Sequence, residues 1–130
     1  MNDANQNMDF DMQTAWLRRF KSDSESNIKA FSLRLKEALP EQVTIYEKKP
    51  LLFGTPKITG VRVSLGDYDY TLEIVKGQLK ATIAMVVRGI TLNTKSIDPA
   101  EWFTKLLAET QKATEHAKNL SESLSIFMSS

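Results

Sequence analysis

Hydrophobic and polar residues alternate through the middle of the chain, which is the pattern of half-buried β-strands. Residues 61–65 have apolar side chains at every second position, and the alternation resumes over residues 68–74. A two-residue turn at Gly66-Asp67 pairs Leu65 with Tyr68 and places every apolar side chain on one face. The pattern therefore predicts an antiparallel hairpin.

A second hairpin is predicted directly after the first. A turn at Gly77-Gln78 pairs Lys76 with Leu79 and keeps the apolar positions of residues 79–87 on the same face. By this parity Arg88 takes the solvated face of the strand.

Two further segments, at the ends of this region, are candidates for strands. Val43–Lys48 is a candidate first strand, and Ile90 with Leu92 indicates a short edge strand. We expect the sheet to be an antiparallel meander of three to four strands.

Helical spacing appears before the sheet. It predicts one helix over residues 9–20 and a second over about residues 25–39, which Pro40 ends. The Asn-rich residues 1–8 are expected to be disordered. Residues 48–57 contain two prolines and a glycine and predict a loop, whose apolar Leu51–Phe53 we expect to pack under another element.

One long helix is predicted at the C-terminal end. Asp98 is its N-cap, Pro99 its first residue, and Ile97 and Trp102 form a hydrophobic staple. Because no glycine or proline follows, the helix would have about 28 residues and a length of roughly 40 Å.

The second half of this helix is expected to project beyond the sheet. A narrow seam of small and apolar residues at spacings of three and four is typical of a surface that pairs with another helix. Its members are Thr110, Ala113, Ala117, Leu120, Leu124 and Phe127. Either the first helix of the same chain or a second copy of the protein would cover the seam, and we favour a homodimer.

Together these elements define an α+β fold in a single domain, residues 1–130. N-terminal helices and the C-terminal helix cover one face of the antiparallel sheet, or pair beside it.

Composition limits the partners. Seventeen basic and sixteen acidic residues leave a net charge of +1 and are mixed along the chain, so no strong field favours nucleic acid. The chain has no cysteine, no apolar run long enough to span a membrane, and no secretory signal at its polar N-terminus. We therefore expect a cytoplasmic protein.

Candidate catalytic residues are few. His116 is the only histidine and stands among polar residues, where a solvated side chain is the simpler interpretation. Asp67 and Asp69 lie at a hairpin tip, which offers no cleft for acid–base chemistry. Without a nucleophile motif or a phosphate-binding glycine loop, we expect no catalytic residue, no cofactor and no metal.

Two groups of residues are compatible with a binding site for a small molecule. The cluster of Lys48, Lys49, Lys57 and Arg62 near Phe53 is compatible with an anionic ligand, although we favour a solvated loop. Tyr68 and Tyr70 could line a pocket between sheet and helix, although we favour a core position for both.

Three segments resemble a small group of uncharacterised bacterial proteins. They are ALPEQVTIYEKKPLLFG, VRVSLGDYDYTLEI and VVRGITLNTKSIDPAEW, and the similarity covers roughly residues 35–107. The resemblance implies a bacterial cytoplasmic protein and transfers no catalytic residue.

The sequence favours a non-enzymatic interaction or adaptor protein, which associates with itself or binds a protein partner through the C-terminal helix. The alternative is a carrier that holds an apolar or anionic small molecule between sheet and helix.

Overall fold

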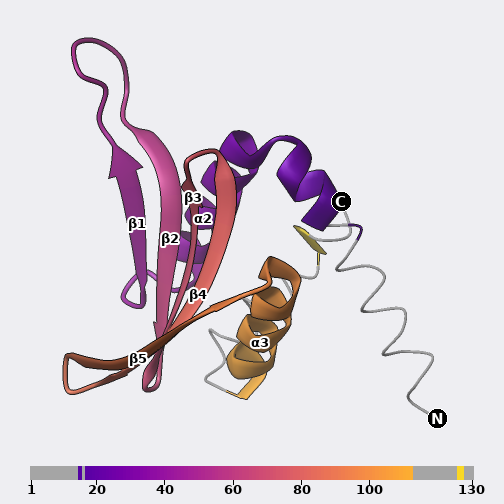
Figure 1. Ribbon diagram of the computed structural model, residues 1–130, viewed down its shortest axis with the longest axis vertical. Coiled ribbons are helices and arrows are strands. Elements are labelled where there is room, and N and C mark those ends of the chain that lie inside the picture. The colour runs from indigo at the N-terminus through magenta and orange to yellow at the C-terminus, as the bar shows by residue number, and fades with distance from the viewer. Residues whose placement is uncertain (1–14, 16, 113–125, 128–130) are drawn as a thin grey trace.

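The computed structural model describes residues 15, 17–112 and 126–127, and it has helices on one side of an antiparallel sheet (Figure 1). A helical segment, residues 17–22, precedes the labelled elements. These are α2 (Ser24–Ala38), β1 (Val43–Lys48), β2 (Lys57–Leu65), β3 (Tyr68–Val75), β4 (Gln78–Val87), β5 (Ile90–Ile97) and α3 (Pro99–Lys112). Residues 1–8 and most of the predicted first helix lie outside the described residues.

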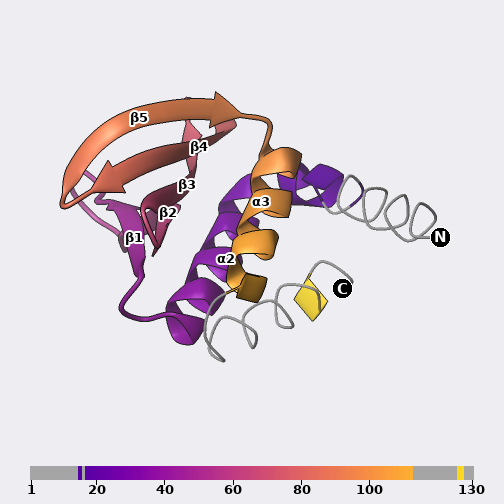
Figure 2. The same cartoon turned by 90° about the horizontal axis from the view of Figure 1, so that it is seen from below.

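The sheet is a meander in which each strand pairs with the strand that follows it in the sequence. The described residues form five strands in the order β1-β2-β3-β4-β5, so the α+β prediction is confirmed but the expected three to four strands are too few. The sheet curves, and both α2 and α3 lie on its concave side (Figure 2). A curved sheet with one covered face explains why apolar and polar residues alternate along the strands.

The first hairpin has the predicted register, with Leu65 opposite Tyr68, Val63 opposite Tyr70 and Val61 opposite Leu72. Gly66 occupies the first turn position with a φ of 60°, which glycine adopts without steric cost.

The register predicted for the second hairpin is wrong by two residues. Its turn is Lys76-Gly77, with φ values of 52° and 77°, so that Ile74 pairs with Leu79. Positive φ at both central positions defines a type I′ turn, which matches the twist of the strands that it joins. Because the error is an even number of residues, the apolar side chains still share one face.

Arg88 is exposed, as expected, but it is not on the outer face of a strand. It forms a second turn of the same kind with Gly89, at φ values of 53° and 79°, and Val87 pairs with Ile90 across it. The edge strand that follows is therefore β5, which continues to Ile97 and is longer than the sequence indicated.

The core lies between the helices and the concave face of the sheet. Its centre is the ring of Phe31 in α2, which lies 6.2 Å from Phe20, 6.2 Å from Trp102 and 5.0 Å from Phe103, centroid to centroid. Buried aliphatic residues surround these rings: Ile28, Leu35, Leu39, Val43, Val61, Val63, Leu72 and Leu106. Aromatic contacts therefore join α2 to α3.

The start of α3 is as predicted. The Asp98 Oδ1 atom accepts a hydrogen bond from the Ala100 amide at 2.8 Å, and the Asp98 carbonyl accepts one from the Trp102 amide at 2.9 Å. The first bond satisfies an N–H group of the first turn that has no partner within the helix, and the second is the first i→i−4 hydrogen bond of the helix itself.

One straight helix from Pro99 to Phe127 is not compatible with the described residues. The Phe31 ring contacts both Phe103, at 5.0 Å, and Phe127, at 6.2 Å. A straight helix would separate Phe103 from Phe127 by about 36 Å. The expected overhang is therefore wrong for Phe127, because α2 of the same chain covers this side chain.

Gly60 in β2 provides a test of the sheet. A Cβ atom there would lie 2.5 Å from the Cβ of Glu73 and 2.9 Å from the backbone oxygen of Leu72 in β3. Because backbone atoms cannot move aside cheaply, Gly60→Ala should lower the free energy of unfolding by about 1–3 kcal/mol. Urea denaturation followed by circular dichroism measures this loss.

The matched control is Gly77→Asn, in a turn where nothing lies within 4 Å of the added Cβ. Asparagine tolerates positive φ, so this variant should lose less than Gly60→Ala. Equal losses would contradict close packing of β2 on β3.

Candidate functional site

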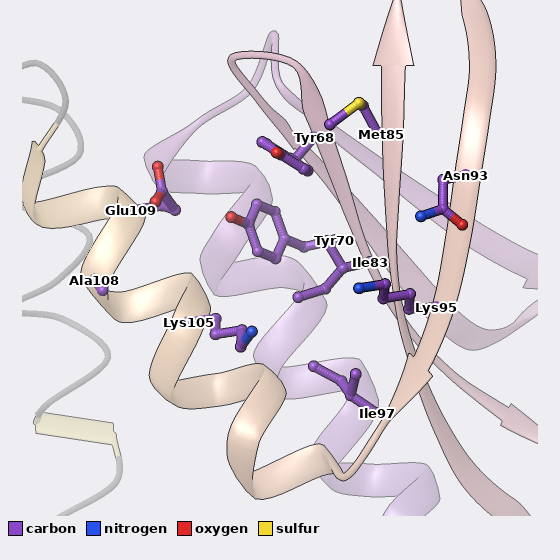
Figure 3. A pocket seen from close by; sticks show the side chains of 10 residues that line it. All are labelled: Tyr68, Tyr70, Ile83, Met85, Asn93, Lys95, Ile97, Lys105, Ala108 and Glu109. Carbon is purple, nitrogen blue, oxygen red and sulfur yellow. The ribbon is translucent and has the colours of Figure 1, made fainter.

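A groove lies between α3 and the concave face of β3, β4 and β5 (Figure 3). Its volume is about 450 Å³, within the range of small-molecule sites in proteins. Three strands and one helix contribute its lining: Tyr68, Tyr70, Ile83, Met85, Asn93, Lys95, Ile97, Lys105, Ala108 and Glu109.

The sheet wall of the groove is built from residues that are neighbours across the strands. Met85 pairs with both Tyr68 and Asn93, and Ile83 pairs with both Tyr70 and Lys95. Each row therefore crosses β3, β4 and β5 on the concave face.

A β-bulge decides which residues of β5 enter the groove. The register between β4 and β5 shifts between Met85 and Val86, where Met85 pairs with Asn93 but Val86 pairs with Thr91. Leu92 is the extra residue and is 61% exposed. The bulge thereby reverses the side-chain parity of β5 and places Lys95 beside the apolar Ile83.

The helix wall exists because α3 has two different faces. Phe103 and Leu106 are buried in the core, whereas Lys105, Ala108 and Glu109 line the groove. The first turn is anchored on the sheet, because the indole Nε1 of buried Trp102 donates a hydrogen bond to the Thr82 carbonyl at 3.1 Å. Downstream of this anchor a groove separates α3 from the sheet (Figure 3).

The charges of the groove are unevenly distributed along it. Lys95 reaches in from β5 and Lys105 from α3, while Glu109 lies one helical turn further along α3 (Figure 3). Lys105 also pairs with Glu101 at 3.8 Å, on a surface where both side chains are more than half exposed. Such a pair contributes little and leaves the lysine available to a ligand.

Tyr70 is the buried polar group of the groove, with only 4% of its surface exposed. Burial raises the pKa of Tyr70 to about 12, with smaller contributions from the charge of Glu109 and from Tyr68. The hydroxyl is therefore protonated at neutral pH and can donate a hydrogen bond. It is a poor general base, since its pKa lies far above neutrality.

The other candidates for chemistry lie apart from the groove. Asp69 accepts a hydrogen bond from the Ser64 hydroxyl at 2.7 Å, and Asp67 is exposed in the turn between β2 and β3. His116 lies outside the described residues. Within the part of the chain that the structure describes, no group of three or more histidine, cysteine or acidic residues is placed to hold a metal ion.

The predicted cluster of basic residues is only partly assembled. Lys48, Lys49 and Lys57 line one hollow, but Arg62 lies further along β2, where its Nη2 is 3.5 Å from the Thr44 hydroxyl. Leu51, Leu52 and Phe53 do not pack under any element, contrary to expectation, because all three are almost fully exposed.

For Tyr68 and Tyr70 the sequence left two interpretations, a core position or the lining of a pocket, and each is correct in part. Tyr70 belongs to the core and also lines the groove, whereas Tyr68 is 38% exposed at the groove rim. Phe53 and Trp102 do not line this groove.

Two residues of the predicted interaction seam are described. Thr110 is fully buried, and its hydroxyl donates a hydrogen bond to the Leu107 carbonyl at 2.8 Å. Phe127 packs on Phe31, with the Arg34 guanidinium 5.7 Å from its ring centre. The other four members, Ala113, Ala117, Leu120 and Leu124, lie outside the described residues.

Sequence reasoning missed the polar residues of the groove, which are Asn93, Lys95, Lys105 and Glu109. The alternation in β5 puts Ile90 and Leu92 on the same parity, so it gives no sign that Lys95 faces inward. The spacing of Lys105, Ala108 and Glu109 by three and four was the available signal for a second face of α3.

Comparison of the chain with protein-family models, with curated proteins and with solved structures gives no match. The resemblance to uncharacterised bacterial proteins thus stays a prediction. No helix in the described residues is both long and apolar enough to cross a membrane.

Tyr70 gives the groove a measurable pH dependence. Its pKa is 10.0 in an unfolded chain and about 12 here, so the folded state holds this proton more tightly. Stability should therefore fall as the pH rises from 10 toward 12, because only the unfolded chain ionises readily in that interval. Tyr70→Phe should flatten this part of the profile, measured by urea denaturation at a series of pH values.

Tyr68→Phe is the control, since Tyr68 is 38% exposed at the rim. With Tyr68→Phe, more of the fall in stability between pH 10 and 12 should remain than with Tyr70→Phe. An unchanged slope in Tyr70→Phe would mean that this hydroxyl is not buried.

Proposed function

We propose that this protein is a non-enzymatic binding protein whose groove between α3 and the sheet holds a small molecule with an apolar body and an anionic end. The observation that carries the proposal is the meeting of Lys95 and Lys105 from two elements over an apolar floor. Apolar pockets with a few convergent polar groups are typical of ligand sites.

Each part of such a ligand has a counterpart in the groove. The ring of Tyr70 with Ile83 and Ile97 would contact the apolar body. The two lysines would hold the anionic end, and their attraction is stronger beside apolar walls than in open water. The protonated Tyr70 hydroxyl could donate a further hydrogen bond.

A binding role is supported over catalysis by the composition of the lining. The ten lining residues include no serine, threonine, cysteine or histidine, and the raised pKa of Tyr70 keeps that group protonated. The polar groups of this groove are suited to hold charge rather than to transfer a proton at neutral pH.

Self-association through the C-terminal seam stays a prediction. We favour the groove because both described members of the seam are engaged within this chain, Thr110 by burial and Phe127 by its contact with Phe31. The groove, in contrast, faces solvent.

Ligand binding can be tested with dodecanoate, an anion with an apolar chain, and dodecanol, its uncharged counterpart. In isothermal titration calorimetry we expect one saturable site for dodecanoate and weaker binding of dodecanol. Lys95→Gln with Lys105→Gln should weaken dodecanoate binding about tenfold or more, because each charge-assisted contact is worth roughly 1.5–3 kcal/mol. Ala108→Phe should block the groove without changing its charge.

The matched control is Lys21→Gln with Lys80→Gln, which removes two exposed lysines away from the groove. This pair should bind dodecanoate as the parent does. Absence of saturable binding, or equal loss in the control pair, would overturn the proposal.

A further inference from the structure

The loop between β1 and β2 carries the most exposed apolar side chains of the described residues. Leu51, Leu52 and Phe53 are 102%, 85% and 90% exposed. The loop projects past the end of the sheet, away from α3 (Figure 1). Isolated apolar residues on a surface are ordinary, but three in sequence at a projecting tip indicate a contact with something outside the chain.

A hollow at the base of this loop is rich in lysine. Lys48, Lys49, Lys57 and Lys76 line one hollow, of about 470 Å³, with Glu25 as its single acidic member. The meander brings Lys76 there, because the β3–β4 turn lies at the same end of the sheet as the β1–β2 loop (Figure 1). Glu25 pairs with Lys57 at 3.2 Å on an exposed surface, so the hollow keeps a net positive charge.

The sequence of the loop separates its apolar tip from acidic groups. No aspartate or glutamate occurs from residue 48 to residue 57. Pro50 and Pro56 flank the tip and restrict its backbone, and Gly54 has a φ of 116°, which favours glycine. The tip is therefore a short apolar projection next to a hollow that four lysines line.

We propose that this loop docks the protein on an anionic lipid surface, with Leu51, Leu52 and Phe53 inserted among the acyl chains and the four lysines against the headgroups. Exposed apolar side chains next to a cluster of basic residues are an arrangement by which peripheral proteins bind anionic bilayers. No membrane-spanning helix is required for such an attachment.

The identity of the cations favours a lipid surface over a protein partner. All four are lysines, which are depleted at protein–protein interfaces, where arginine is enriched. Lysine is a flexible, strongly hydrated point charge, which suits headgroups that are mobile and lack one fixed geometry.

Co-sedimentation with vesicles tests the proposal. The full chain should bind phosphatidylcholine vesicles that contain phosphatidylglycerol, and bind pure phosphatidylcholine vesicles more weakly. Added salt should lower the binding, because it screens the lysines. Leu52→Ser with Phe53→Ser should reduce the partition coefficient about tenfold or more, since two apolar side chains no longer leave water.

Charge is tested separately with Lys48→Gln and Lys49→Gln, which should remove most of the preference for phosphatidylglycerol. Ile90→Ser with Leu92→Ser is the matched control, because these side chains are 63% and 61% exposed at the opposite end of the sheet. Circular dichroism should be unchanged in the loop variants, since the substituted side chains support no packing.

Three results would overturn the proposal. They are a parent that does not bind anionic vesicles, a parent that binds neutral and anionic vesicles equally, and a control pair that loses as much binding as the loop variants. The first would be expected if the tip enters a pocket of another protein. None of them bears on dodecanoate binding in the groove.

Discussion

The contact that the structure depends on is the packing of Phe31 against the aromatic residues around it. This one ring in α2 contacts Phe20 on the N-terminal side and both Trp102 and Phe103 in α3. Each such pair contributes about 0.5–1.5 kcal/mol beyond the burial of its surface. At Phe31 the helices α2 and α3 contact each other directly, and not only through the sheet. This ring therefore limits the position that α3 can take over the strands.

The groove follows from this constraint. Trp102 holds the first turn of α3 on β4 through the Thr82 carbonyl, and Phe103 holds the same turn against α2. The helix is thus fixed from two sides at its start, and its groove face, with Lys105 and Glu109, stands opposite β3, β4 and β5 across the groove. Because the sheet is curved, β5 contributes to the wall of the groove that lies opposite α3 (Figure 2). The β1–β2 loop lies at the other end of the sheet, so the two proposed binding surfaces are separate.

Much of the fold could be predicted because it depends on local rules. The alternation around Gly66-Asp67 fixed the first hairpin, and Asp98-Pro99 fixed the start of α3 to the residue. The polar site could not be predicted in the same way. Lys95 faces the groove only because a bulge in β5, with Leu92 as the extra residue, reverses the parity of that strand, and no residue type in β5 signals the bulge. Likewise, helical periodicity extends past Lys112 in the sequence, but only a tertiary contact reveals that Phe127 returns to Phe31.

The most direct test of this account is a nuclear Overhauser measurement on protein with protonated aromatic rings and methyl groups in a deuterated background. The account predicts cross-peaks from the Phe31 ring to the rings of Trp102, Phe103 and Phe127 together. It predicts none between the methyl groups of Ala108 and Met85, which lie on opposite walls of the groove (Figure 3). Strong cross-peaks between these two methyl groups, with none from Phe31 to Phe103, would show that α3 lies flat on the sheet, and would contradict both the aromatic constraint and the open groove.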